Sequence, residues 1–117
     1  MRRCIALLIV LAFTASVTWG DTTVPNQGSW TDRSGSLTTG GTAQTIAALR
    51  AGRSYFLFQN ISPDDLWINC GVTAVQDQPS FKIIAGGSFV MEGNSVCTDL
   101  ISVIGATTGQ KFSAKEM

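Results

Sequence analysis

An apolar run rich in aromatic residues spans residues 54 to 61, which read SYFLFQNI. Its aromatic and β-branched residues favour a β-strand. A second run, LWINC at Leu66 to Cys70, follows a polar interruption, SPDD, at residues 62 to 65. Pro63 presets φ for a turn, and the two aspartates that follow can cap backbone N–H groups. We therefore expect these two strands to form a hairpin.

Two further pairs of short apolar segments flank glycine-containing turns, where glycine tolerates positive φ. The pairs are Phe81–Ile84 with Ser88–Met91 around residues 85–87, and Leu100–Gly105 with Lys111–Ala114 around residues 106–109. Residues 42–49 alternate only in part, so a strand and a helical turn closed by Gly52 both remain open there.

About seven short strands separated by turns indicate an all-β fold, a small antiparallel β-sandwich of jelly-roll type. Each strand should bury one face. We expect the core to include Phe56, Phe58, either Trp67 or Ile68, Ile83, Phe89, Ile101, Val103 and Phe112.

An apolar N-terminal segment precedes the sandwich. Residues 1–20, MRRCIALLIVLAFTASVTWG, combine a basic start, an apolar centre and a small residue at Gly20, as in a signal peptide. The apolar part is short for a spanning helix, which needs about 20 residues, but a membrane anchor or an assembly element stays open. Residues 21–35 read as a linker or extended arm, and residues 36–117 as the domain.

The charge balance bears on the choice of partner. The net charge is zero, and without Arg2 and Arg3 six basic and eight acidic residues remain, a balance of −2. No basic cluster survives, so we expect no nucleic-acid binding.

Residue types for catalysis are scarce, since the chain has no histidine, the usual general base and commonest metal ligand. Asp64 and Asp65 would have to face each other across a substrate, or join further oxygen ligands around calcium, and neighbours in a turn do neither readily. We expect no catalytic residue, no metal ligand and no cofactor.

Cys70 and Cys97 are a candidate disulfide. Cys4 lies in the removable segment, so an even pair remains if that segment is cleaved. An oxidising compartment would favour a bond. Two small buried thiols are the alternative.

Four strings in the domain resemble a group of small β-domain proteins of tailed bacteriophages and prophages. They are QNIS at Gln59–Ser62, LWIN-x-G at Leu66–Gly71, GGSF at Gly86–Phe89, and SVIGATTGQKFSAKE at Ser102–Glu116. The resemblance covers residues 36–117. It implies a non-enzymatic virion part, such as a capsid decoration or cement protein, a head-fibre base or a tail component.

The resemblance also implies the mode of action and the partners. Such a protein acts through contacts with other virion proteins, major capsid or tail proteins, and with copies of itself in a homo-oligomer. Trp30 and Trp67 are the candidate interface anchors, because tryptophan is favoured at interface hot spots. The alternative is that Trp30 packs at the domain edge and Trp67 packs in the core.

Two features depart from the phage group: the signal-like start and the cysteine pair. Both favour an exported variant, a periplasmic or secreted β-sandwich that binds or adheres. The location is therefore the virion or, alternatively, the periplasm or the exterior after cleavage. The apolar segment could also serve as an assembly arm or as an anchor in a membrane.

Overall fold

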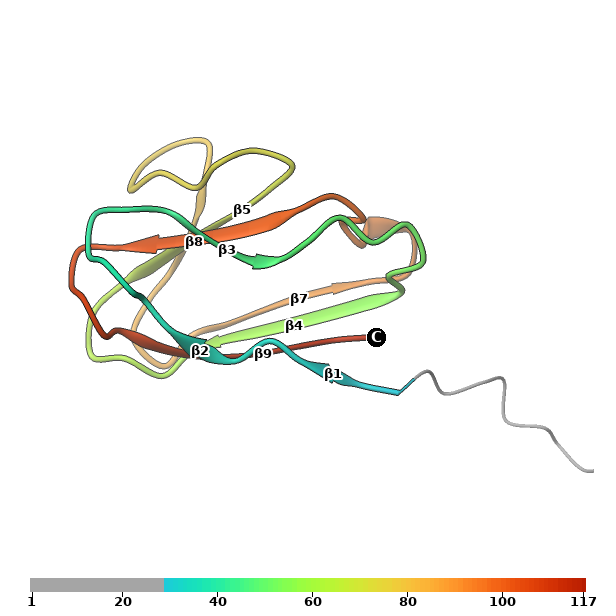
Figure 1. The fold of residues 1–117 in the computed structure, drawn as a ribbon, viewed down its shortest axis with the longest axis horizontal. Helices are drawn as coiled ribbons and strands as arrows, with labels where there is room; N and C mark the ends of the chain where they lie inside the picture. The colour runs from blue at the N-terminus through green and yellow to red at the C-terminus, as the bar shows by residue number, and fades with distance from the viewer. Residues whose placement is uncertain (1–28) are drawn as a thin grey trace, which may run out of the picture.

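The computed structural model describes residues 29–117, which form two stacked antiparallel sheets (Figure 1). The expected all-β sandwich is confirmed. The expectations for residues 1–20, and for the first part of the arm up to residue 28, lie outside the described residues. No helix in the described part is long and apolar enough to cross a membrane.

Nine strands are present in this part of the chain, where about seven are expected from the pattern. The strands are β1 Thr31–Asp32, β2 Gly35–Ser36, β3 Gln44–Ala47, β4 Tyr55–Asn60, β5 Leu66–Cys70, β6 Phe81–Ile83, β7 Ser88–Glu92, β8 Ile101–Gly105 and β9 Lys111–Glu116, with a short 3₁₀ turn, η1, at Gly93–Ser95. The two additional strands, β1 and β2, pair with β9, so the sandwich starts before residue 36.

The strand order is that of a jelly roll. The larger sheet runs β1-β9-β4-β7, with β2 also on β9, and the smaller sheet runs β3-β8-β5-β6. From β2 to β9, every connection except β5–β6 passes from one sheet to the other. This alternation between two sheets is the double-sheet architecture of a jelly roll.

The expected hairpin of residues 54–61 with Leu66–Cys70 is wrong. β4 pairs with β7 and β9, whereas β5 pairs with β6 and β8. Residues 61–65 therefore cross between the sheets. Turn chemistry is the same whether a turn joins strands of one sheet or of two, so the pattern alone could not separate the cases.

Residues 42–49 contain strand β3, not a helical turn. Its pairing with β8 shifts register between Thr45 and Ala47. A bulge of this kind adds a residue to one strand and interrupts the alternation of side chains. The shift explains why the apolar pattern in this segment is incomplete.

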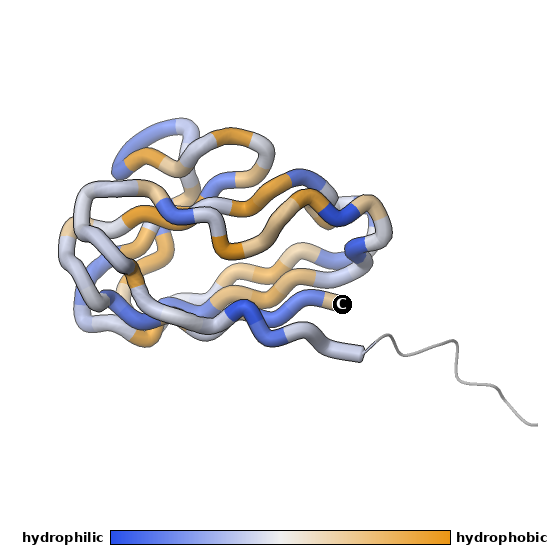
Figure 2. The backbone as a smooth tube through the Cα atoms, in the orientation of Figure 1, coloured by the Kyte–Doolittle hydropathy of each residue, from blue (hydrophilic) through white to orange (hydrophobic). Residues whose placement is uncertain are grey.

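The core lies between the two sheets, and Figure 2 shows apolar segments along the strands of both layers. Phe58 and Phe112 stack there with ring centroids 5.5 Å apart. Ile68 is the buried member of the expected Trp67/Ile68 alternative, because Leu66 and Ile68 share the inner face of β5 and Trp67 faces outward. Phe89 is partly buried, and the other expected core residues are buried.

Candidate functional site

A buried polar cluster holds the sheet crossing at residues 61–65. The Asn60 amide nitrogen donates to the carbonyls of Asp64 (2.8 Å) and Ile83 (2.9 Å), and its oxygen accepts from the Ser62 N–H at 2.9 Å. The Gln110 amide donates to the Asp65 carbonyl (3.1 Å) and to the Ser62 hydroxyl (3.2 Å). These side chains replace water for backbone groups that the crossing would leave unpaired.

Gly105 makes room for this cluster at the end of β8. A Cβ atom at this position would collide with the Gln110 amide and with Leu66. The same amide oxygen accepts from the Thr107 N–H at 3.0 Å, so Gln110 also fixes the β8–β9 turn. One glutamine thereby joins two sheet crossings at the same end of the sandwich.

The two turn aspartates do not provide the caps expected from the sequence. Asn60 caps the turn, while Asp64 and Asp65 accept hydrogen bonds through their backbone carbonyls. The Asp65 carboxylate pairs with Lys82 at 2.9 Å near the surface, a contact that contributes little to stability. Within residues 29–117, no group of three or more acidic or cysteine side chains is placed to hold a metal ion.

Two open depressions flank this turn. One, of about 310 Å³, lies between residues 61–64 and 107–111, and the other, of about 380 Å³, is bordered by Asp64, Asp65, Trp67, Gln76 and residues 106–107. The Lys82 ammonium lies 5.8 Å from the centroid of the Trp67 ring. The two residues are opposite each other on β5 and β6, so they share the outer face of the smaller sheet.

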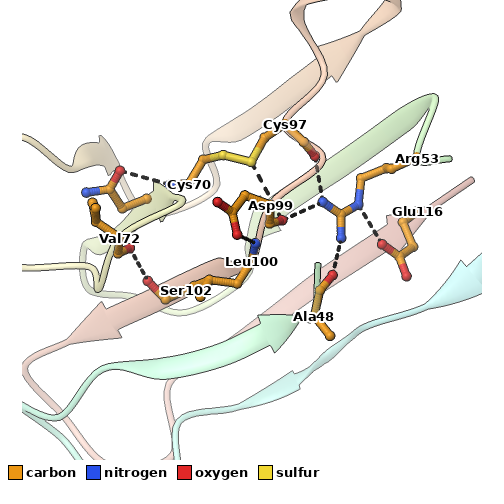
Figure 3. Close-up of a disulfide and its surroundings, with 10 residues drawn as sticks. Ala48, Arg53, Cys70, Val72, Cys97, Asp99, Leu100, Ser102 and Glu116 are labelled. Atoms are coloured by element: carbon orange, nitrogen blue, oxygen red, sulfur yellow. Dashed lines mark hydrogen bonds and ion pairs between the residues drawn. A yellow bond between two sulfur atoms is a disulfide. The ribbon is translucent and has the colours of Figure 1, made fainter. Parts of the chain in front are cut away.

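A disulfide joins Cys70 to Cys97 at the other end of the sandwich (Figure 3). The two Cα atoms are 6.2 Å apart, and 27 positions separate the residues along the chain. The bond connects the end of β5 to the loop that leads into β8. The structure thus brings this candidate pair together.

Arg53 and Glu116 form a buried ion pair beside this disulfide. Arg53 Nε donates to Glu116 Oε2 at 2.7 Å, and its remaining nitrogens donate to the carbonyls of Ala48, Cys97 and Asp99 (Figure 3). Arg33 donates to Glu116 Oε1 at 2.8 Å through Nε and at 2.6 Å through Nη2. The pair therefore ties the C-terminal strand to three separate loops.

Burial and hydrogen bonding act in opposite directions on Glu116. Burial raises the pKa of its carboxyl, but hydrogen bonds from Arg53 and Arg33, with the charges of both arginines, outweigh burial and lower the pKa below 4.5. A carboxylate held in this way remains charged inside the protein. The arrangement is that of a structural clamp, in which both carboxylate oxygens accept hydrogen bonds from arginine side chains.

The outer face of the larger sheet carries aromatic and apolar side chains that are exposed or partly exposed. Trp30 stands edge-on to Tyr55, with centroids 5.1 Å apart, and 49% of Trp30 is exposed. Across the strands, Leu57 lies opposite Val90 on β7 and opposite Lys115 on β9. The name "outer face of the larger sheet" is used below for the surface that Trp30, Tyr55, Leu57 and Val90 form.

The two candidate anchors lie on different sheets. Trp30 precedes β1 on the larger sheet, whereas Trp67 is half-buried in β5 of the smaller sheet.

The buried polar residues Asn60 and Glu116 were missed in the sequence analysis, although the alternation of side chains along their strands indicates that both face inward. Asn60 follows Phe56 and Phe58 at inward spacing, and Glu116 follows Phe112 and Ala114 in the same way.

No protein-family model, curated protein or solved structure matches this chain.

Proposed function

We propose that this chain is a non-enzymatic structural protein of a bacteriophage particle, an accessory part of the capsid decoration, head-fibre or tail type. It acts through contacts with other virion proteins. The resemblance of its four strings to phage β-domain proteins supports the proposal. A jelly roll serves in capsid domains and also in lectins, so the fold is compatible with the role and does not fix it.

The observation that carries the proposal is a contrast between the interior of the sandwich, where polar groups bond to one another, and its surface, where apolar side chains are exposed. In the described residues, every buried side-chain nitrogen or oxygen has a hydrogen-bond partner within the protein. The charged and amide groups of the interior are thus used to hold loops. Exposed aromatic and apolar side chains, Trp30 and Val90 among them, remain as the means of contact.

The alternative function is a periplasmic or secreted binding module. The disulfide supports it, because such bonds persist in oxidising compartments. The depression bordered by Trp67, Asp64 and Gln76 offers one aromatic ring with polar neighbours. Lys82 already contacts that ring, which makes it a weaker platform for a sugar than a bare tryptophan.

Mass spectrometry of purified particles and of the periplasm of the producing host distinguishes the two functions. A chain present in washed particles at a constant ratio to the major capsid protein supports the virion role. A chain found only in the periplasm and beginning at Asp21 contradicts this role and favours the binding module. The same spectra, read without reductant, report whether Cys70 and Cys97 are bonded.

A further inference from the structure

We propose that β7 pairs with β7 of a second copy across a two-fold axis at Val90, which makes the protein a dimer with one sheet continuous through both copies. Within residues 29–117, β7 is the last strand of the larger sheet beyond β4. An uncovered strand edge of this kind is a template for pairing with another chain. The choice of a protein as the partner rests on the proposed contact function, whereas the choice of a second copy of this chain rests on the geometry of the edge alone.

The backbone of β7 has a defined open side. Tyr55 exchanges hydrogen bonds with Met117 at the end of β9, at 3.0 and 3.1 Å. Groups on successive residues alternate in direction, so Phe56 and Phe58 bond towards β7, where they face Met91 and Phe89. The N–H and C=O groups of Ser88, Val90 and Glu92 therefore point away from β4, to the open edge.

The open edge of β7 is complementary to the same edge of a second copy. An antiparallel pairing centred on Val90 sets Val90 against Val90 of the second copy, and Ser88 against Glu92 of the second copy. All outward backbone groups of residues 88–92 then find partners. Leu57 lies opposite Val90 within each copy, so an apolar row runs unbroken across the axis, with Lys115 at each end.

The charges favour this register. Glu92 is the only charged residue of β7, and the two-fold pairing places it opposite a serine hydroxyl. A parallel pairing in register would set the two Glu92 side chains side by side, where like charges repel. The edge also has no proline and no lysine, the residues that commonly block strand addition.

The inner side of the proposed junction is apolar. Phe89 and Met91 face the core, and the two-fold pairing places Phe89 opposite Met91 of the second copy. Phe81 stacks on Phe89 with centroids 5.4 Å apart and is 57% exposed. A second copy would cover part of this ring. Because only five residues pair, we expect a dissociation constant in the micromolar range.

Sedimentation measurements on the full chain, purified from the producing host, test the proposal at protein concentrations from micromolar to several hundred micromolar. We expect the sedimenting mass to rise from that of one chain to that of two as the concentration increases. Val90→Lys places two ammonium groups opposite each other and should weaken the dimer about tenfold or more. Thr45→Lys adds the same charge to β3, the edge of the other sheet, and should leave the dimer unchanged. Circular dichroism confirms that each variant is folded.

Two substitutions at Ser88 test the register without disturbing Val90. Ser88→Lys should tighten the dimer several-fold at low salt, because each lysine meets Glu92 of the second copy, whereas Ser88→Glu should weaken it. A wild-type mass that stays that of one chain overturns the proposal. So does a dimer that Val90→Lys leaves intact, or one that responds equally to both Ser88 variants. Mass spectrometry of the particles tests the proposed virion function separately, because its result does not depend on whether the chain forms this dimer.

Discussion

Glu116 is a buried carboxylate whose two oxygens are both held by arginine side chains. The residue is fully buried and so is Arg53, with 0% and 2% of their surfaces exposed. Removing one charge of such a pair leaves the other uncompensated in a poorly solvated place. The pair is therefore a sensitive point of the fold, although an apolar replacement of both residues could be tolerated.

We expect Glu116→Gln to lower the free energy of unfolding by about 3 kcal/mol, since it leaves the Arg53 guanidinium buried without a counter-charge. Urea denaturation at neutral pH measures the change. Lys115→Gln on the exposed face of β9 is the matched control and should lie within about 0.5 kcal/mol of the wild type. Equal stabilities for the two variants would show that the pair is not structural.

The same carboxylate predicts an acid dependence. Its pKa in the folded protein is lower than the ordinary value of 4.5. The unfolded chain therefore binds a proton first, and the stabilisation from Glu116 is complete above pH 4.5 and is lost as the pH falls through the folded pKa. Stability measured by urea denaturation should decline below that pH. Relative to wild type, Glu116→Gln should lose less stability on acidification, and parallel curves would refute this assignment.

Asn60 is the residue on which the crossing from β4 to β5 depends. Its amide replaces water for the carbonyls of Asp64 and Ile83. Asn60→Ala should cost about 2 to 3 kcal/mol, because it leaves buried backbone groups without partners. The exposed neighbour Gln59→Ala serves as a control in the same thermal or urea melts. A cost no greater than that of the control would mean that water satisfies these groups.

At the scale of elements, strands and core were predictable from the sequence, but sheet membership was not. The runs at residues 54–61 and 66–70 contain the strands β4 and β5, as their aromatic and β-branched residues predict, and Phe56, Phe58 and Ile68 are buried as expected. Which sheet each strand joins depends on long-range pairing, which no local pattern encodes. Asn60 and Gln110 hold the crossing through their side-chain hydrogen bonds. In the sequence, Asn60 reads as a polar residue after an apolar run, and Gln110 as a polar residue after a glycine turn.

The disulfide joins the end of β5 to the loop before β8, beside the point where Cys70 pairs with Ile101 in the sheet. Reducing it, or replacing both cysteines with serine, should lower stability by about 3 kcal/mol, given the length of chain it closes. The Cys97 carbonyl also accepts from Arg53, so loosening the loop should weaken the buried pair. Melting curves with and without reductant measure the loss. Reductant should not affect the double-serine variant, and an effect there would point to another cause.

At the scale of the whole molecule, the sandwich separates a tightly bonded interior from an outer face whose aromatic and apolar groups have no bonding role inside. Trp30 packs against Tyr55 in a T-shaped arrangement, and about half of its surface is open. Such a ring can enter a pocket on a neighbour at little cost to its own fold. The virion proposal therefore places the energetic centre of attachment on the larger sheet.

We expect Trp30→Ala to lower the number of copies retained on purified particles about tenfold or more, since a central tryptophan typically accounts for 2 kcal/mol or more of binding. Its melting temperature should change little, because the ring is half exposed. Leu49→Ala removes a side chain that is even more exposed, but from the β3–β4 connection and not from the sheet face, and should not alter retention. Quantitative mass spectrometry of washed particles compares the two. Equal retention would move the attachment site away from the larger sheet, and Trp67→Ala would then test the outer face of β5.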